Sequence, residues 1–546
     1  MSKIKIFGLG GLDEEGKNCY VVEVDNSIYV FDCGLKYASG NLLGIDYIIP
    51  DFSYLITNRK KIKGIFITHG HNENMGSVKD LLAAIPEVKI FATKFTKFML
   101  KETGVDEKKI IEITSHKKIS FGSTSIFPIS VSHSVPDAVM YVINTKDGAI
   151  CYTGDFVFDP TMSGNFDMDL GKIAYVGKQG VLCLLSESTF SEKKGHTSPK
   201  HHLTEYYKDL LNHNSDRMIF SVLPDHIYNL IEIIDAAANK HRKIVVLGRK
   251  LFNIISFAKK EGYMNFSKDI IGDLSDLKSS NCIVLVANDR TNSYSNLSKI
   301  LNGYDKFVKL KNTDTIVFAE RRYDSTEKML AKLENEFAKK GCNIINIPKD
   351  KEISHHGSSE DLMLMIKLMN PTYFMPVRGE YRYMVNHANL ASTLGISSEN
   401  IILKQNGETV SFENKKLIQK FEKIKTGEAL IDGNSNDDIG NLVIKDREML
   451  AENGIVLISA TISRKTKEII SGPEITTRGF IYIKDSHDLI AEIKEKSLDI
   501  ITRNITPKQV DYNQIKVQIR EELGKFLYSE TECKPMIIAV VQEVWL

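Results

Sequence analysis

Cysteine is scarce in this sequence, and its distribution argues against two classes of protein. The 546 residues contain 7 cysteines, at positions 19, 33, 151, 183, 282, 342 and 533. No two of them form a CxxC pair, and an odd, scattered set is not typical of a disulfide-stabilised extracellular domain. We therefore expect a protein of the reducing cytoplasm.

Long apolar runs and an excess of one charge are also missing. The run "MIIAVV" (Met536 to Val541) is far shorter than the roughly 20 residues that span a bilayer. The first residues, "MSKIKIFGLGG", contain too few apolar side chains for a signal peptide. With 71 basic and 70 acidic side chains the formal net charge is +1, so any nucleic-acid binding requires a local basic groove. No membrane association is expected.

What is present is the composition of a globular protein of several domains. Hydrophobic residues make up 42% and charged residues 26% of a chain that is too long for one core, which favours two to four domains. The first 200 residues contain short β-rich runs such as "SIYVFDCG" and "IKGIFITHG" that end near Asp or His. Side chains at such positions are where a strand-built scaffold carries its chemistry, although each can also be a simple turn residue.

The pattern of predicted secondary structure changes between about residues 206 and 349, where helices and strands alternate. Ile227, Leu230, Ile231 and Ile234 have the 0, 3, 4, 7 spacing of one helix face, and the strand "KIVVLG" follows. This alternation favours a doubly wound insert with a parallel sheet.

The helical pattern returns near residue 362 and ends before Pro371. Leu362, Met365, Ile366 and Met369 form an apolar stripe that we interpret as core, and "TYFMPV" predicts a strand. "DGNSNDDIGN" (432–441) is rich in turn-forming residues and indicates a linker or loop boundary. Beyond it, "GIVLISATIS", helical stretches at about 486–504 and 508–528, and "KPMIIAVVQEV" predict a small αβ domain.

The segment "ITHGHNENMG" (67–76) contains a candidate pair of metal ligands. His69 and His71 follow an apolar run, and His133 in "VSHSVPD" and Asp155 in "YTGDF" follow at long spacing. Imidazole and carboxylate groups are the expected ligands of zinc or manganese. The two long gaps leave open that these residues are unrelated.

Five motifs, in order, resemble those of the ribonuclease J family: "THGHxxxxG", "HSVPD", "YTGDF", "SESTFSEKKGHT" and "PVRGEYR". The resemblance extends to "GGLDEEGKN" near the start and "SGPEITTRGF" (471–480) in the last domain. The "HNEN" variant and the missing His before "GEYR" are most similar to the second paralogue of that family, which is typically the weaker nuclease and partners the active one.

The resemblance implies an α/β architecture. A metallo-β-lactamase αββα sandwich would carry an inserted doubly wound β-CASP domain and a small αβ C-terminal domain. The corresponding boundaries are 1–205 and 350–430 for the sandwich, 206–349 for the β-CASP domain, 431–450 for a linker and 451–546 for the last domain.

The resemblance also implies a first metal site that is intact and a second that is degraded. The first would use His69, His71, His133 and Asp155. At the positions of the second-site ligands, beside the shared Asp155, this chain has Glu73, Asn74 and Arg378. We expect at most one Zn²⁺ or Mn²⁺ ion, with a metal-free site as the alternative.

Arg378 is the most consequential of these replacements. A guanidinium has five donors, no acceptor and a permanent charge, so it cannot ligate a metal. One hypothesis is that Arg378 replaces the charge of the second ion and pairs with Asp155 and Glu73. The alternative is that it points to solvent in a decayed site.

Other residues are assigned roles only through the family motifs. Glu187 and His356 correspond to motif residues and, with Glu73 and Asp155, are the catalytic candidates. Ser354, His356 and Arg290 are candidates for contacts with RNA phosphates, although Arg290 can equally be a solvated surface residue. "ANDRTNSYS" (287–295) stands where the family has a phosphate-binding loop, which puts recognition of a 5′ phosphate in doubt.

Two functions follow from the resemblance. One is a metal-dependent ribonuclease of RNA processing and decay, acting as a 5′-to-3′ exonuclease, an endonuclease or both, with weak intrinsic activity. The other is a catalytically inactive RNA-binding and assembly subunit, either a homodimer or tetramer or a heteromer with an active ribonuclease J paralogue. A small-molecule hydrolase would leave the long insert and the C-terminal domain unexplained.

Overall fold

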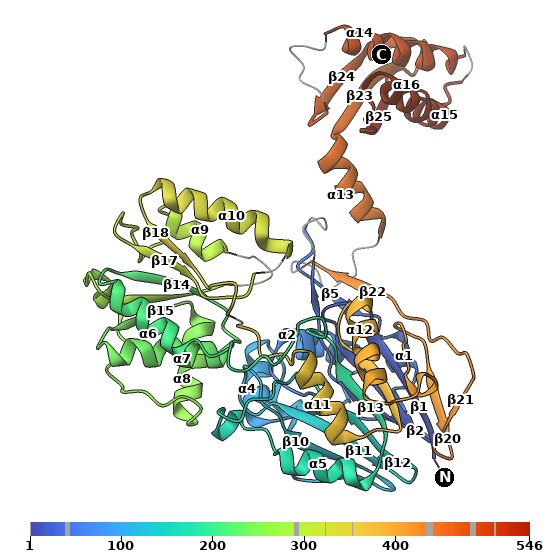
Figure 1. Ribbon diagram of the computed structural model, residues 1–546. Coiled ribbons are helices and arrows are strands. Elements are labelled where there is room, and N and C mark those ends of the chain that lie inside the picture. The colour runs from blue at the N-terminus through green and yellow to red at the C-terminus, as the bar shows by residue number, and fades with distance from the viewer. Residues whose placement is uncertain are drawn as a thin grey trace. The chain divides into compact units, whose positions relative to one another are not determined.

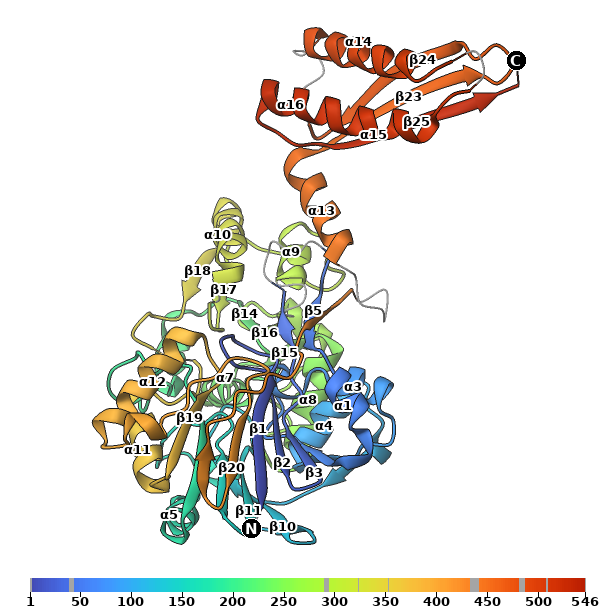
Figure 2. The same cartoon turned by 90° about the vertical axis from the view of Figure 1, so that its right-hand side faces the viewer.

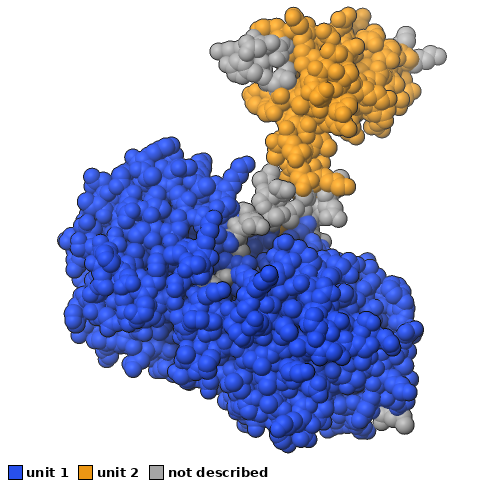
Figure 3. All heavy atoms as spheres, in the orientation of Figure 1, with its two compact units in different colours: residues 1–38, 46–431 blue, residues 39–45, 432–546 orange. Residues whose placement is uncertain are grey.

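The protein is described by a computed structural model of residues 2–38, 44–288, 294–322, 324–351, 353–432, 441–480, 487–506 and 509–545. It divides into two compact units, Met1–Ala38 with Asp46–Ile431 and Ser39–Ile45 with Asp432–Leu546 (Figure 3). None of the helices in these ranges is long and apolar enough to cross a membrane.

Two sheets form the centre of the first unit. Within the described ranges, one has the strand order β21 (Lys416–Ile418), β20 (Val410–Glu413), β1 (Lys3–Gly10), β2 (Cys19–Val24), β3 (Ser27–Phe31), β6 (Ile62–Phe66), β7 (Ile90–Ala92) and β8 (Ile110–Glu112). The other has the order β19 (Tyr373–Val377), β13 (Val181–Glu187), β12 (Gly148–Tyr152), β11 (Val139–Thr145), β10 (Thr124–Ser130) and β9 (Ile119–Phe121).

Alternation along the strands packs these sheets face to face. In β1, Ile4 and Ile6 point into the space between the sheets, whereas Phe7 and Leu9 point to the outer face. Successive strand residues point to opposite faces, and both faces here are apolar, so both are covered. The inner layer is rich in aromatic rings, including the stacked pair Phe31 and Phe66, 5.5 Å between centroids.

Helices cover the two outer faces (Figure 2). On the outer face of the first sheet lie α1 (Ser53–Thr57), α3 (Val78–Ala84) and α4 (Lys94–Glu102). On the outer face of the second lie α5 (Leu170–Gln179), α11 (Ser359–Met369) and α12 (Tyr381–Thr393). The four apolar residues of the predicted stripe in α11 are all buried there, which confirms their assignment to the core.

The insert is a parallel sheet with helices on both faces (Figure 1). Its strand order is β15 (Ile244–Leu247), β16 (Ile283–Ala287), β14 (Met218–Val222), β17 (Thr315–Phe318) and β18 (Asn343–Asn346). One face packs on α6 (Thr204–His213), α7 (Ile227–Asn239) and α8 (Arg249–Lys260), and the other on α9 (Ser295–Leu301) and α10 (Asp324–Lys339). The predicted fold class, a sandwich with a doubly wound insert, is therefore confirmed.

A short sheet and the second unit complete the fold. The short sheet pairs β4 (Lys36–Tyr37), β5 (Tyr47–Pro50) and β22 (Glu428–Ile431). In the second unit, β24 (Ile469–Arg478), β23 (Ile455–Ser463) and β25 (Met536–Val544) form a sheet that packs on helices around its own apolar cluster. These helices are α14 (His487–Arg503), α15 (Tyr512–Gln518) and α16 (Gly524–Thr531), and α13 (Asn441–Asn453) precedes them and overlaps the predicted linker.

Candidate metal centre

The candidate site residues follow the ends of strands in both sheets. Asp155 comes shortly after β12, Glu187 ends β13 and Arg378 directly follows β19. These three strands are parallel neighbours, so their carboxyl ends meet at one edge of the sheet. His69 follows β6 of the other sheet and His133 follows β10, and both reach the same edge.

Four side chains converge on one point. Nδ1 of His71 lies 3.0 Å from Nε2 of His69 and 3.2 Å from Nε2 of His133. Oδ2 of Asp155 lies 3.5 Å from Nε2 of His69 and 3.9 Å from Nε2 of His133. Bonds of about 2.0–2.2 Å to a tetrahedral zinc ion place its ligand atoms about 3.3–3.6 Å apart, so this arrangement fits such an ion.

Hydrogen bonds on the far side of the rings set which nitrogen faces the centre. Nδ1 of His133 donates to the carbonyl oxygen of His355 at 2.8 Å, which leaves the lone pair on Nε2. The hydroxyl of Thr68 lies 3.0 Å from both carboxylate oxygens of Asp32 and 2.9 Å from Nδ1 of His69. Because that hydroxyl donates to Asp32, it accepts from His69, and again Nε2 carries the lone pair. Such partners orient metal-ligating histidines.

Burial favours the neutral form of the histidines, which is the form that binds a metal, and it opposes ionisation of the carboxyl group. It lowers the pKa of His69 and of His133 well below the ordinary value, helped by the neighbouring imidazoles, so both rings are neutral. Burial raises the pKa of Asp155 to about 7, against the effect of the Arg378 cation. Both oxygens of Asp155 are buried and accept no hydrogen bond from a described residue. A buried carboxylate without donors fits a cation ligand.

Arg378 lies against the same carboxylate. Its Nε is 2.6 Å from Oδ1 of Asp155, although the N–H direction does not meet hydrogen-bond geometry, so this is an ion pair. Its Nη1 donates to the Thr189 hydroxyl and is 4.0 Å from Oε2 of Glu187. Burial lowers the pKa of Arg378, but the charges of Asp155, Glu187 and Glu73 raise it above the ordinary value. The guanidinium is thus buried among carboxylates and does not point to solvent.

The turn that carries Arg378 is held on both sides by main-chain hydrogen bonds. Arg378 has a left-handed backbone with φ 53°. Its N–H donates to the carbonyl of Gly11 at 2.9 Å, and its own carbonyl accepts from the N–H of Ser188 at 3.0 Å. Glu14 and Gly379 exchange two further main-chain bonds at 3.0 and 3.2 Å. These bonds fix the direction in which residue 378 leaves the backbone.

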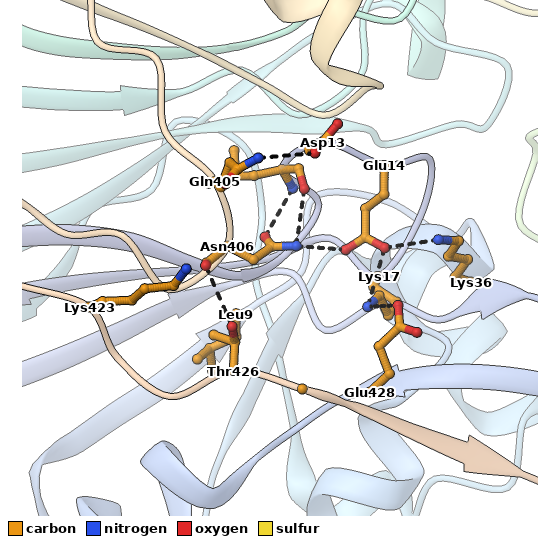
Figure 4. Close-up of a pocket in the computed structure, with 12 residues that line it drawn as sticks. Leu9, Asp13, Glu14, Lys17, Lys36, Gln405, Asn406, Lys423, Thr426 and Glu428 are labelled. Atoms are coloured by element: carbon orange, nitrogen blue, oxygen red, sulfur yellow. Dashed lines mark hydrogen bonds and ion pairs between the residues drawn. The ribbon is translucent and has the colours of Figure 1, made fainter. Parts of the chain in front are cut away.

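A polar network around the buried side chains of Glu14 and Lys17 (Figure 4) adjoins this turn through the main-chain bonds between Glu14 and Gly379. Oε2 of Glu14 is 3.2 Å from Nζ of Lys17 and 3.2 Å from Nζ of Lys36, while Oε1 accepts from Nδ2 of Asn406 at 2.9 Å. Lys17 also pairs with Glu428 at 2.5 Å, which connects the turn to β22. The network lines a cavity of about 380 Å³ in which cations and carboxylates balance.

Asn74 turns its amide toward a residue outside the ligand set. Its Nδ2 donates to Oδ2 of Asp32 at 2.8 Å, and its buried Oδ1 has no hydrogen-bond partner in the described part of the chain. Asp32 is the residue that sequence reasoning missed here, since it accepts from Thr68, Asn74 and Tyr152. The position of Asp32 at the end of the predicted strand "SIYVFD" is the sequence feature that could have identified it as a site residue.

Glu187 and His356 form a pair next to the centre. Nδ1 of His356 is 2.8 Å from Oε2 of Glu187, whose Oε1 accepts from the N–H of Phe156 at 2.7 Å. Burial raises the pKa of Glu187, as does the Asp155 charge, and burial lowers that of His356. Ser354, two residues before His356 in the sequence, is buried. Arg290 lies outside the described residues.

Comparison with known proteins agrees with the motifs. Family models match as follows: the metallo-beta-lactamase superfamily (12–177), the ribonuclease J beta-CASP domain (215–336), a Zn-dependent metallo-hydrolase RNA specificity domain (349–403) and the ribonuclease J C-terminal domain (442–544). These matches agree with the fold and with a metal cofactor.

Curated relatives span the chain from end to end. Ribonuclease J2 of Bacillus subtilis (strain 168) is 36% identical over 549 residues, covering 99% of each chain. Ribonuclease J 2 of Staphylococcus aureus (strain MRSA252) is 33% identical, covering 99% of this chain and 98% of that one. A solved structure, a protein of unknown function from Enterococcus faecalis V583, covers 75% of this chain and 100% of its own with a TM-score of 0.51 and 15% identity, and shows the fold alone. The chain therefore belongs to the ribonuclease J family.

Proposed function

We propose that this protein acts in RNA processing and decay as a ribonuclease J-type protein whose own cleavage activity is weak. The observation that carries the proposal is the ion pair between Arg378 and Asp155 at 2.6 Å. Two ions about 3.5–4 Å apart normally stabilise the attacking and leaving oxygens of a phosphodiester. A fixed guanidinium beside the carboxylate that two ions would share leaves room for one ion at this centre.

His69, His71, His133 and Asp155 would hold that ion, which we propose is Zn²⁺ or Mn²⁺. Three imidazoles and one carboxylate suit either metal. When bound, the ion would supply a Lewis acid for hydrolysis. Around it, the buried pair of His356 and Glu187 would orient groups at the reacting phosphate, with Glu73 as a further carboxylate candidate.

RNA is the proposed substrate or ligand, and Ser354 and His356 are the proposed phosphate contacts among the described residues. Arg322 is not included, because it is already paired on the surface with Glu327 at 2.8 Å and Glu334 at 2.5 Å. We propose the cytoplasm as the compartment, consistent with the bacterial relatives and with seven free thiols.

The second candidate function is an inactive RNA-binding and assembly subunit. It is favoured by the fact that Arg378 cannot ligate while the surrounding turn and core are intact. The partner would be another copy of this chain, as a dimer or tetramer, or an active ribonuclease J paralogue.

Restoring the second ligand set separates the two functions. We expect a chain with Glu73→Asp, Asn74→His and Arg378→His to cleave 5′-monophosphorylated RNA faster than the parent. The reason is that two imidazoles replace an amide and a cation, and a shorter carboxylate replaces that of Glu73. We expect the parent to cleave RNA more slowly than the roughly 1–10³ per second at which enzymes typically turn over. Cleavage of labelled RNA is the measurement.

The matched control carries the same three substitutions together with His69→Gln, which removes a ligand of the first ion. It should lose any gained activity. A triple variant that folds and binds metal but stays as slow as the parent would favour the assembly role. A parent that cleaves at ordinary enzymatic rates would contradict the proposal of weak activity.

A further inference from the structure

A second cluster of metal-ligating groups lies in the first unit. Oδ2 of Asp159 is 2.8 Å from Nε2 of His201 and 2.5 Å from Nε2 of His202. Like the first centre, this cluster has all its ligand atoms within 4.8 Å of one another. Asp159 and His201 have fully buried side chains. No motif of the family accounts for these two histidines, and the ribonuclease proposal does not use them.

Asp159 is oriented toward both rings. Its other oxygen, Oδ1, accepts from the N–H and the hydroxyl of Thr161 at 2.8 and 2.7 Å, which fixes the carboxylate. The carboxylate is therefore held with its Oδ2 toward the two imidazoles.

The buried ring of His201 lacks hydrogen bonds to the described residues that would account for its position. Neither of its nitrogens makes a hydrogen bond with any described residue, although Nε2 is only 2.8 Å from the Asp159 oxygen. The N–H direction does not point at that oxygen. Buried polar atoms are normally paired, so the two unpartnered nitrogens of this buried ring call for a partner. The Asp159 oxygen beside Nε2, which is hydrogen-bonded to His202, is a ligand that such a partner would share.

His202 is the most exposed member of the cluster, with 25% of its side chain accessible. Its Nε2 forms a hydrogen bond with Oδ2 of Asp159 at 2.5 Å and lies 3.0 Å from the Thr161 hydroxyl. The N–H of His202 donates to the carbonyl of Pro199 at 3.0 Å, so the chain turns here and two consecutive side chains reach one oxygen. A zinc ion held by all three side chains would replace the hydrogen shared by His202 and Asp159 and move the ligand atoms to about 3.3–3.6 Å from one another, with a fourth position left for water.

We propose that Asp159, His201 and His202 bind one Zn²⁺ ion at a site separate from that of His69, His71, His133 and Asp155. The ion would join the loop after β12 to the segment that leads into α6 and the inserted sheet. His355 lies between the two sites, since its carbonyl accepts from His133 and its ring is 4.7 Å from that of His201. Without an ion the same arrangement would be two rings sharing one carboxylate oxygen, and the experiment distinguishes these.

The test is the number of zinc ions bound by the full-length chain. The parent and each variant are loaded with Zn²⁺, desalted and analysed by elemental analysis. We expect His201→Gln with His202→Gln to bind one ion per chain fewer than the parent. The matched control is His116→Gln, which removes a half-exposed imidazole 3.2 Å from Asp169 and should leave the count unchanged.

A second variant separates the two sites. His69→Gln with His71→Gln removes first-site ligands, and we expect it still to bind one Zn²⁺ and to show a Co²⁺ absorption spectrum that disappears when Asp159→Asn is added. This measurement also serves if the His201 and His202 variant does not fold. The proposal is overturned if the folded His201 and His202 variant binds as many ions as the parent, or if the His69 and His71 variant binds none.

Discussion

Arg378 gives the centre a positive charge that does not depend on metal supply. A bound ion can be removed by a chelator, whereas the guanidinium beside Asp155 is part of the chain. Removing one partner of a buried ion pair leaves an uncompensated charge in a low-dielectric site. The stability of the metal-free protein should therefore depend on this side chain.

We predict that Arg378→Met lowers the unfolding free energy of the metal-free chain by about 3–5 kcal/mol, the range for breaking a buried pair. Urea unfolding in the presence of a chelator measures this. Arg382→Met is the matched control, since Arg382 is 61% exposed and its surface pair with Glu380 should contribute less than about 1 kcal/mol.

Adding Asp155→Asn to Arg378→Met should recover part of the loss, because the buried charge is then removed with its partner. Equal stability of Arg378→Met and parent without metal would contradict the charge-replacement hypothesis.

Part of the candidate site could be predicted from residue types and part could not. Residue types suggested His69, His71, His133 and Asp155 as ligands but left open that they are unrelated. The family resemblance assigned them to one centre, and the structure brings these four together. The hypothesis placed Arg378 beside Asp155 and Glu73; Asp155 is its ion-pair partner, and Glu187 is the second carboxylate measured beside it. The sequence carries no distances, so it could not rank carboxylates from different strands. The roles of all these residues stay predictions.

Helices and strands could be predicted from the sequence where apolar residues recur at the spacing of one face of a helix or strand. The stripe of Ile227, Leu230, Ile231 and Ile234 lies in α7, and "KIVVLG" contains β15. β24 was missed, because Gly472 and Pro473 within it are turn formers. Since β24 lies at the edge of its sheet, a proline there removes no ladder bond from a central strand.

One helix in the insert is capped by a carboxylate from its neighbour. Glu232 of α7 accepts from the N–H of Leu203 at 2.7 Å and from the N–H of Thr204 at 3.0 Å, at the start of α6. Burial raises the pKa of Glu232 to about 7, although these hydrogen bonds oppose the shift. The folded state therefore binds a proton more tightly than the unfolded state does.

This shift predicts a pH dependence with a definite sign. Because the folded pKa lies above the ordinary value, the contribution of Glu232 to stability is fully present below about pH 4.5 and is lost as pH rises through about 7. We expect the unfolding free energy of the parent to fall relative to that of Glu232→Gln between pH 5 and 8, by on the order of 2–3 kcal/mol.

Urea unfolding across this pH range is the measurement. Glu205→Gln serves as the control, since that side chain is 82% exposed at the start of the same helix. A difference between parent and Glu232→Gln that stays constant from pH 5 to 8 would refute the assignment.

The two units have separate cores, so they should unfold separately. The cluster around Val456, Ile458 and Ile493 contains residues of the second unit only. Domains with their own cores can fold alone. We predict two calorimetric transitions for the full chain, and loss of one in a chain that ends at Ile431.

The remaining transition should shift by less than about 3 °C, equivalent to roughly 1 kcal/mol. Collapse of the shortened chain would mean that the first unit depends on the second.

The fold class was predictable because each sheet and helix layer carries its own apolar pattern. The domain boundaries proposed from the sequence stay predictions.

The turn around residue 378 has a consequence for how such proteins diverge. Its main chain is tied to Gly11, Glu14 and Ser188 by bonds that involve no atom of the arginine side chain. A substitution of residue 378 therefore places a different side chain at the same position of the site, because the main-chain bonds of the turn are kept. Under the second-site role proposed for position 378, a few substitutions would remove or restore a ligand there with no change in the main chain of the loop.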